Sequence, residues 1–311
     1  MKYYYAPMEG ITGYLYRRAH HDFYPGIDRY YIPYVEPHEK RAFNSREKND
    51  ISPENNHGLN AVPQILTRDA EGFVRMSRFL VEQGGYTEIN LNLGCPSGTV
   101  VSKGKGSGFL AFTDELNRFL EHIYTNAPCD ISIKTRIGRL NEDEFPELLD
   151  IYNQYPVKEL IIHPRTREDY YKYPVHPSAF QYAVDHAKAP LCYNGDLFHI
   201  ENYEKRKSDF PTVDHWMIGR GLMINPQLVE MIQKGNAFDL SRFIAFHDRV
   251  YSDYEIAMPG SSHLLMKMKE LWSYWMLSFP ENKKLEKNLK KAKSKTEYEI
   301  AVKAIFNSYE A

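Results

Sequence analysis

One cysteine of this chain stands where its thiol could take part in chemistry. The preceding segment, residues 87–93, alternates strictly between polar and apolar residues, which predicts a half-buried β-strand. Cys95 follows it directly, and Pro96 keeps that cysteine out of the helical conformation. The nearby glycines 104, 106 and 108 permit tight turns and close backbone approach to a ligand. The structural alternative is a small apolar cysteine that closes a strand.

Polar side chains stand at the ends of the other predicted strands as well. In residues 131–136 the two-residue period puts Ser132, Lys134 and Arg136 on one face. A lysine inside a barrel is costly unless an anion balances it, and that anion is either an internal carboxylate such as Glu88 or a bound ligand. The remaining strand-end groups are Gln64, Asn92, His163, Asn194, Asp196 and Arg220. Each alone has a structural explanation, but together they predict one polar rim.

The strands that must carry this rim alternate with helices. Eight strands are predicted, at Lys2–Ala6, Arg29–Val35, Ala61–Leu66, Thr87–Leu93, Ile131–Arg136, Glu159–His163, Leu191–Asn194 and Trp216–Ile218. Amphipathic helices are predicted at Asp69–Gln83, Thr113–Thr125, Phe145–Gln154 and Pro177–His186. This order favours an α/β fold, the closed (β/α)8 TIM barrel, because the first strand lacks the glycine fingerprint of an open dinucleotide-binding sheet.

Glycines follow the last two predicted strands, which is where such barrels hold a phosphate. Backbone N–H groups at Gly195 and Gly219 and the guanidinium of Arg220 suit that group. A phosphate at this edge and a lysine inside the barrel together predict a phosphorylated cofactor across the mouth. Flavin mononucleotide fits, since its reduced ring carries negative charge that Lys134 would meet.

Composition limits the other possibilities. The chain has 311 residues, is 42% hydrophobic and 26% charged, and carries a net charge of −2, so no global field indicates a nucleic-acid partner. Its three cysteines form no Cys-x-x-Cys pair, which argues against a disulfide framework and a structural zinc site. With no signal-peptide core and no long apolar run, we expect a reduced, cytoplasmic protein without a membrane partner. No motif indicates a protein partner, and we expect a monomer.

The pattern changes after about residue 236. Helices are predicted at Leu240–Met258, Leu264–Leu277 and Thr296–Tyr309, which indicates a barrel domain at 1–236 and a helical domain at 237–311. Residues 283–295 hold seven lysines and one glutamate. This lysine run is either a solvated helix face or a surface that contacts phosphates.

The combined motifs resemble those of the tRNA-dihydrouridine synthase family over residues 1–230. They are Ala6-Pro7-Met8-Glu9-Gly10, Gln64, Asn92-Leu93-Gly94-Cys95-Pro96, Lys134-Thr135-Arg136, His163-Pro164-Arg165-Thr166, Asn194-Gly195-Asp196 and Gly219-Arg220-Gly221-Leu222. The resemblance implies an FMN-bound barrel, with NADPH as electron donor, that reduces uridine in tRNA to 5,6-dihydrouridine. It also implies that the helical tail binds tRNA.

The resemblance further implies roles for individual residues. Pro7, Met8 and Glu9 would pack on the flavin, and Gln64, Lys134 and His163 would hold its ring. The ribityl phosphate would meet Asn194, Gly195, Asp196, Gly219 and Arg220, and the uracil would face Asn92, Arg136 and Tyr171. Cys95 would protonate C5 after hydride reaches C6, since a thiol with a pKa near 8.5 stays protonated at neutral pH. Its rival role is a thiolate nucleophile helped by Lys103 and Lys105.

The chain departs from the family pattern mainly after the sixth predicted strand. Pro164 replaces a glycine, Asp169 stands where glutamine is common, and residues 173–177 differ as well; Gly13 replaces an aspartate near the first strand. Two other functions stay open: an FMN barrel reductase of a small pyrimidine or enone, and an inactive tRNA-binding or chaperone-like protein.

Overall fold

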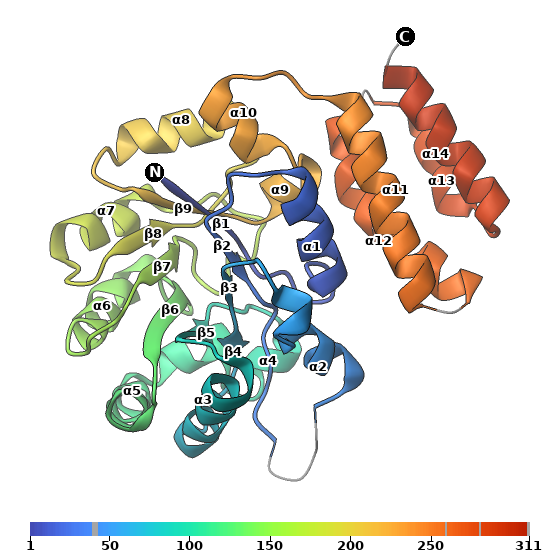
Figure 1. The fold of residues 1–311 in the computed structure, drawn as a ribbon. Coiled ribbons are helices and arrows are strands. Elements are labelled where there is room, and N and C mark those ends of the chain that lie inside the picture. Colours follow the sequence, from blue (N-terminus) through green and yellow to red (C-terminus); the bar gives the residue numbers. More distant parts are fainter. Residues whose placement is uncertain (39–42, 259, 280, 310–311) are drawn as a thin grey trace. The chain divides into compact units, whose positions relative to one another are not determined.

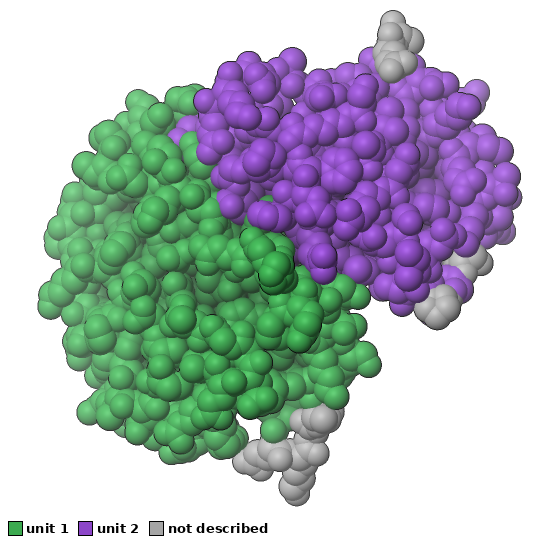
Figure 2. All heavy atoms as spheres, viewed as in Figure 1, with its two compact units in different colours: residues 1–14, 28–196, 204–218 green, residues 15–27, 197–203, 219–311 purple. Residues whose placement is uncertain are grey.

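The computed structural model describes residues 1–38, 43–258, 260–279 and 281–309. It divides into two compact units (Figure 2). Unit 1 comprises residues 1–14, 28–196 and 204–218, and unit 2 comprises residues 15–27, 197–203 and 219–311. The predicted boundary between residues 236 and 237 stays a prediction, since these units interleave along the chain.

Unit 1 contains a parallel β-barrel. Its sheet has the order β3-β2-β1-β9-β8-β7-β6-β5-β4, and Pro63 alone separates β3 from β4. These two are halves of one interrupted strand, so the sheet closes on itself as an eight-stranded barrel. The strand bounds are β1 Lys2–Tyr5, β2 Arg29–Tyr31, β3 Ala61–Val62, β4 Gln64–Ile65, β5 Glu88–Leu93, β6 Asp130–Arg136, β7 Leu160–His163, β8 Leu191–Tyr193 and β9 His215–Ile218.

The predicted barrel is therefore confirmed, with two strands shorter than expected by more than one residue. Proline explains both, since it cannot donate to a strand ladder. Pro33 follows β2, so the predicted run 29–35 stops at Tyr31 and its last residue, Val35, forms only an isolated bridge to Ile65. Pro63 splits the predicted run 61–66, yet its carbonyl still accepts the backbone N–H of Asn90.

Helices of unit 1 surround the strands (Figure 1). They include α2 Ser45–Ile51, α3 Ala70–Gly84, α4 Gly98–Val101, α5 Thr113–Asn126, α6 Phe145–Tyr152 and α7 Pro177–His186. Gly85 ends α3 in the left-handed conformation, at φ +67°, which closes the last turn through Leu80 and Val81 carbonyls. The apolar face expected for this amphipathic helix consists of Phe73, Met76, Phe79 and Leu80. Three of these side chains are buried, whereas Phe79 is 42% exposed.

The barrel interior holds an apolar cluster above an ionic network. The cluster is Tyr4, Ala6, Tyr31, Val62, Ile161, Cys192 and Met217. Below it, at the amino ends of the strands, the buried Glu159 carboxylate accepts the hydroxyl of Tyr4 at 3.1 Å and pairs with Arg29 at 3.4 Å and with His215. Arg29 also pairs with Glu88 at 3.0 Å. The opposite, carboxyl ends of the strands carry the predicted polar rim.

The longest segment of unit 2, which begins at Gly219, is helical. Its helices include α9 Arg220–Ile224, α10 Leu228–Lys234, α11 Leu240–Ala257, α12 Ser261–Trp275, α13 Lys283–Lys291 and α14 Lys295–Tyr309. Phe243 of α11 makes edge contacts with Trp275 and Phe306, and Tyr298 accepts the indole N–H of Trp272 at 2.9 Å. These aromatic contacts join α11, α12 and α14 into one core. None of the helices described is long and apolar enough to cross a membrane.

Two further helices, α1 Tyr14–Phe23 and α8 Ile200–Asp209, contain residues of both units.

Candidate active site

A chain of side-chain amides crosses three neighbouring strands at the carboxyl half of the barrel. Strand register places Gln64 of β4 beside Asn90 of β5, and Asn90 beside Ser132 of β6. Gln64 Nε2 donates to Asn90 Oδ1 at 2.7 Å, and Asn90 Nδ2 donates to Ser132 Oγ at 2.9 Å. Asn92 Nδ2 donates to Gln64 Oε1 at 2.7 Å. All four residues are buried, so the chain replaces water as their hydrogen-bond partner.

The chain of amides ends on the turn that carries Cys95. Asn92 Oδ1 accepts the backbone N–H groups of Gly94, at 3.0 Å, and Cys95, at 2.9 Å. The Cys95 carbonyl in turn accepts the backbone N–H and the hydroxyl of Ser107, at 3.1 and 2.9 Å. A Cβ on Gly106 would lie 2.8 Å from that carbonyl. Gly106 therefore permits a close approach to the chain's own backbone. Cys95 is held on one side by Asn92, through its N–H, and on the other by Ser107, through its carbonyl.

Cys95 is half-buried and forms no disulfide with Cys129 or Cys192. Burial raises its pKa above the ordinary value, although the Ser97 backbone N–H and the Arg136 charge partly offset that effect. The protonated thiol is therefore the form present at neutral pH. Lys105, one of two lysines expected to favour a thiolate, instead pairs with Glu36 at 2.7 Å.

Lys134 is a cation that has no counter-ion within the described part of the chain. It is half-buried on β6 beside Asn92, and no hydrogen bond or ion pair joins its ammonium to any residue that the structure describes. Burial, together with the charge of Arg136, lowers the pKa of Lys134 to about 8. Glu88, its candidate internal partner, pairs with Arg29 at the amino end of the barrel instead. The observation favours the second explanation of this lysine, an anionic ligand.

Arg136 lies at the next inward position of β6 and is 1% exposed. Its Nε donates to the Gly94 carbonyl at 3.1 Å, and its Nη1 donates to the Thr166 carbonyl at 2.6 Å. The guanidinium lies 5.1 Å from the ring centre of Tyr171, a residue that is 51% exposed. Among the described residues Nη2 has no hydrogen-bond partner. Arg136 therefore joins the Cys95 turn to the loop after β7 and keeps one donor for a ligand.

His163 at the end of β7 contacts Arg165, a residue not predicted for the site. Arg165 Nη1 lies 3.1 Å from His163 Nε2 and 2.8 Å from Asp196 Oδ1, while its Nη2 pairs with Asp196 Oδ2. Asp196 has φ +46°, a left-handed conformation that aspartate tolerates better than most residues. Its carboxylate, expected near a phosphate, is thus neutralised by Arg165, which leaves only its backbone to face an anion.

The remaining predicted residues lie at the ends of their strands. Asn194 donates to the Met217 carbonyl at 2.8 Å, which links β8 to β9. Pro7 and Met8 are half-buried after β1, and Glu9 pairs with Arg46. Gly219 and Arg220 belong to unit 2, where the Arg220 guanidinium lies 4.8 Å from the ring centre of Phe198. Their phosphate-binding role stays a prediction.

Asp169, one of the departures from the family pattern, organises the loop after β7. Its Oδ2 accepts the backbone N–H and hydroxyl of Thr166, at 2.7 and 2.8 Å, and lies 3.0 Å from His176 Nε2. His176 Nδ1 reaches Glu142 at 3.1 Å. Two substituted positions of this loop, 169 and 176, therefore contact each other directly.

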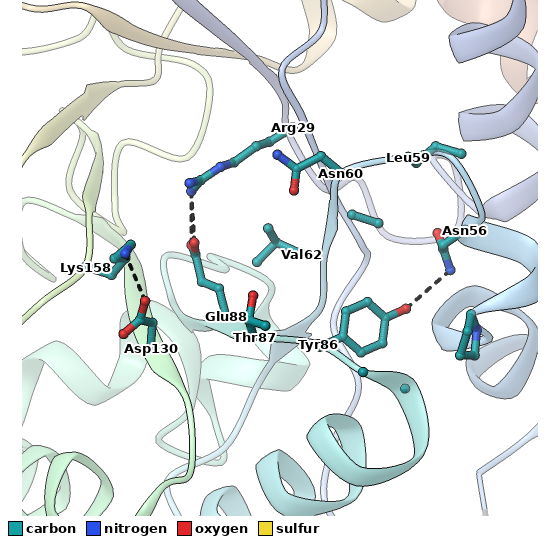
Figure 3. Close-up of a pocket in the computed structure, with 14 residues that line it drawn as sticks. Arg29, Asn56, Leu59, Asn60, Val62, Tyr86, Thr87, Glu88, Asp130 and Lys158 are labelled. Carbon is teal, nitrogen blue, oxygen red and sulfur yellow. Dashed lines mark hydrogen bonds and ion pairs between the residues drawn. The ribbon is translucent and has the colours of Figure 1, made fainter.

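A polar pocket of about 400 Å³ lies at the other end of the barrel (Figure 3). Its charged groups pair within it, Arg29 with Glu88 and Lys158 with Asp130 at 2.9 Å. Asn56 donates to the Tyr86 hydroxyl at 3.4 Å. The charged side chains of this pocket are therefore paired with one another.

A closed parallel barrel with a cysteine, a lysine and an arginine at the carboxyl ends of its strands defines a barrel enzyme. Residues 4–310 match the model of the dihydrouridine synthase (Dus) family, and the chain belongs to that family. Among curated relatives, tRNA-dihydrouridine synthase B of Pasteurella multocida is 26% identical over 229 residues, which are 73% of this chain and 68% of the relative. The tRNA-dihydrouridine(16) synthase of Pseudomonas syringae is 28% identical over 177 residues, or 55% of each chain.

Solved structures share the fold with little sequence identity. Morphinone reductase in complex with tetrahydroNAD superposes with a TM-score of 0.54 and 12% identity, over 78% of this chain and 90% of that one. TcOYE with pHBA gives a TM-score of 0.55 and 8% identity, over 76% and 90%. At these identities the likeness establishes the barrel alone.

Proposed function

We propose that this protein reduces uridine in tRNA to 5,6-dihydrouridine, using FMN and NADPH. One observation carries the proposal: a protonated thiol on a hydrogen-bonded turn and a lysine without a counter-ion among the described residues lie on neighbouring strands of the barrel. The reaction needs both, a proton for C5 and a cation beside an electron-rich ring. Family membership supports the same reaction.

The residues present fit a flavin. Lys134 lacks an anionic partner among the described residues, and Arg136 Nη2 lacks an acceptor there. A bound flavin, reduced by NADPH, would supply the hydride for uracil C6. Lys134 would hold the anionic edge of the ring, with Gln64 and His163 beside it. Pro7, Met8 and Glu9 would pack against the ring, as the family resemblance implies.

Cys95 then acts as the acid. Its raised pKa keeps the proton on sulfur at neutral pH, and the hydrogen bonds on both sides of its backbone fix the turn that carries the thiol. A thiolate nucleophile would need the opposite shift of the pKa. Asn92 retains one N–H and Arg136 retains Nη2, so both can donate to the uracil carbonyls, and Tyr171 offers an exposed ring near them.

The tRNA itself would meet basic helix surface of unit 2. Helix α13 exposes its lysines and buries Leu289. Lys290 pairs with Glu286, whereas no ion pair to a described residue involves Lys287 or Lys291. Unpaired lysines release counter-ions on binding phosphate, which is the main source of nucleic-acid affinity.

A direct assay tests the function. The purified protein is examined for a flavin spectrum and then incubated with NADPH and unmodified tRNA, and nucleosides are analysed by mass spectrometry. Flavin together with dihydrouridine supports the proposal. Flavin that is reduced and reoxidised without dihydrouridine would indicate the small-molecule reductase instead, and a colourless protein that binds tRNA would indicate the inactive binder.

A further inference from the structure

The direction of every hydrogen bond in the amide chain follows from its last link. Backbone N–H groups can only donate, so the Asn92 atom that meets Gly94 and Cys95 is the oxygen, Oδ1. Asn92 Nδ2 therefore points to Gln64 and requires its oxygen. Gln64 Nε2 then faces Asn90, which must accept through Oδ1 and donate through Nδ2 to Ser132. One orientation of each amide satisfies the whole chain.

We propose that Asn90 is a positioning residue for Cys95, acting through Gln64 and Asn92. Asn90 is fully buried within the barrel, two residues before Asn92 on β5, and its nearest partners are Gln64 and Ser132. It therefore contacts the reacting atoms only through other residues. The effect expected on turnover rests on the proposed function. The effect on the Cys95 turn can be measured without an activity assay.

Loss of Asn90 leaves a buried donor unsatisfied. Gln64 is 1% exposed, so its Nε2 cannot turn to water for a replacement. Rotation of the Gln64 amide toward another acceptor removes the acceptor of Asn92 Nδ2. Asn92 is then free to move, and with it the two backbone N–H groups that orient Cys95. A shift of about 1 Å in a reacting group lowers a rate by about 10²-fold.

Two substitutions of Asn90 separate its bonding from its volume. Asn90→Leu keeps the size and removes both hydrogen bonds. Asn90→Asp keeps the acceptor for Gln64 and alters only the bond to Ser132, whose hydroxyl also bonds to the Glu88 carboxylate. Asn56→Leu is the matched control, because Asn56 is also a buried asparagine, and its amide donates to the Asp50 and Ser52 carbonyls, outside the amide chain.

For turnover we expect Asn90→Leu to lower kcat about 10²-fold with little change in KM for tRNA. Asn90→Asp should restore at least a tenth of the wild-type kcat, and Asn56→Leu should keep kcat while lowering the melting temperature. An Asn90→Leu enzyme with wild-type kcat, or an Asn90→Asp enzyme as slow as Asn90→Leu, overturns the proposal.

A second measurement does not depend on activity. The alkylation rate of Cys95 by iodoacetamide is compared with that of half-buried Cys129 in the same protein, by peptide mass spectrometry. Asn90→Leu should change the Cys95 to Cys129 ratio by about tenfold or more, and Asn90→Asp should leave it near wild type. An unchanged ratio in Asn90→Leu refutes the positioning role, even if wild-type protein forms no dihydrouridine and the proposed function itself has failed.

Discussion

Asp169 Oδ2 and His176 Nε2 lie 3.0 Å apart and close the loop that follows β7. The same carboxylate oxygen also accepts both donors of Thr166, and the Thr166 carbonyl accepts from Arg136. One side chain thus joins the two ends of the loop and holds the residue that supports the active-site arginine. The loop departs from the family pattern in sequence while keeping its own internal bonding.

Replacing Asp169 by Asn should loosen this loop. Burial by itself would raise the pKa of Asp169, but the hydrogen bonds from Thr166 and His176 outweigh it and lower the pKa below 3.8. A lowered carboxyl pKa means that the stabilisation is complete above pH 3.8 and is lost as the pH falls through the lower folded-state value. At pH 6 we expect Asp169→Asn to cost about 1.5–3 kcal/mol. The difference between variant and wild type should shrink below pH 4.

Thermal unfolding and amide hydrogen exchange of residues 164–176 measure this effect. Glu168→Gln is the control, because Glu168 is exposed and pairs only with its neighbour Arg167 among the described residues. If Asp169→Asn and Glu168→Gln exchange at the same rate, Asp169 does not hold the loop.

Lys134→Met should weaken flavin binding and stabilise the flavin-free protein. The pKa of Lys134 is lowered from 10.5 to about 8, so below pH 8 the folded protein bears the cost of a buried charge. The methionine variant avoids that cost, which is on the order of 2 kcal/mol at pH 7 once the partial solvent exposure of Lys134 is allowed for. Its advantage should fall as the pH rises from 8 to 10.5. Melting curves of the flavin-free protein across this pH range test the expected gain in stability, and flavin titrations at pH 7 test the expected loss of binding. A Lys134→Met protein that binds FMN as tightly as wild type would exclude Lys134 from the flavin site.

Glu159→Gln should destabilise the barrel without changing its chemistry. Glu159 is 2% exposed, pairs with Arg29 and His215 and accepts two tyrosine hydroxyls, so its loss removes one of the two carboxylates that balance Arg29 and leaves Glu88 as the other. We expect a loss of about 3 kcal/mol in urea unfolding. The exposed Asp130–Lys158 pair is the comparison, and Asp130→Asn should cost less than about 1 kcal/mol. Similar losses in both variants would mean that the buried network contributes little.

Replacing Lys287 and Lys291 by Gln should reduce both tRNA affinity and its salt dependence. Removing one lysine–phosphate interaction lowers the slope of log K against log salt by about 0.9 for duplex and about 0.7 for single strands. Binding is measured at several salt concentrations, with Lys188→Gln and Lys205→Gln as exposed controls of equal charge change. An unchanged slope would place the tRNA-binding surface elsewhere.

Cys95→Ala should retain FMN and lose turnover by about 10²–10⁴-fold, the range expected for removal of a general acid. Cys129→Ala controls for loss of a half-buried thiol and should remain active. Flavin content from the visible spectrum and dihydrouridine by mass spectrometry separate the two effects. Normal product formation by Cys95→Ala would rule out its role as the acid.

The barrel can be predicted from local patterns because its strands carry strong ones. Residues 87–93 alternate, and β5 occupies Glu88–Leu93; the helix predicted at Pro177–His186 forms α7 with the same bounds. Helix α8 escapes such a prediction, since Tyr203 is its one buried residue and it offers almost no apolar stripe.

The candidate site is predictable only in its outline. Strand ends indicate where Cys95, Lys134 and Arg136 lie, but local patterns do not specify which strands are neighbours or in which register they pair. Asn90 faces inward by its position, yet its role depends on the registers that place it between Gln64 and Ser132. Arg165 stands within a matched motif, and its bond to Asp196 joins residues 31 positions apart. Such long-range pairings require the tertiary fold.

The apolar cluster inside the barrel separates two electrically distinct ends. Cys192 lies within it, between the Lys134 and Glu159 charges that both act on its thiol. Ala6, Val62, Ile161 and Met217 have no exchangeable proton, and burial raises the pKa of the three protic members of the cluster, Tyr4, Tyr31 and Cys192. These three groups therefore keep their protons at neutral pH, so the core does not relay charge between the two ends, and a proton consumed in the proposed reaction would come from solvent at the carboxyl ends of the strands.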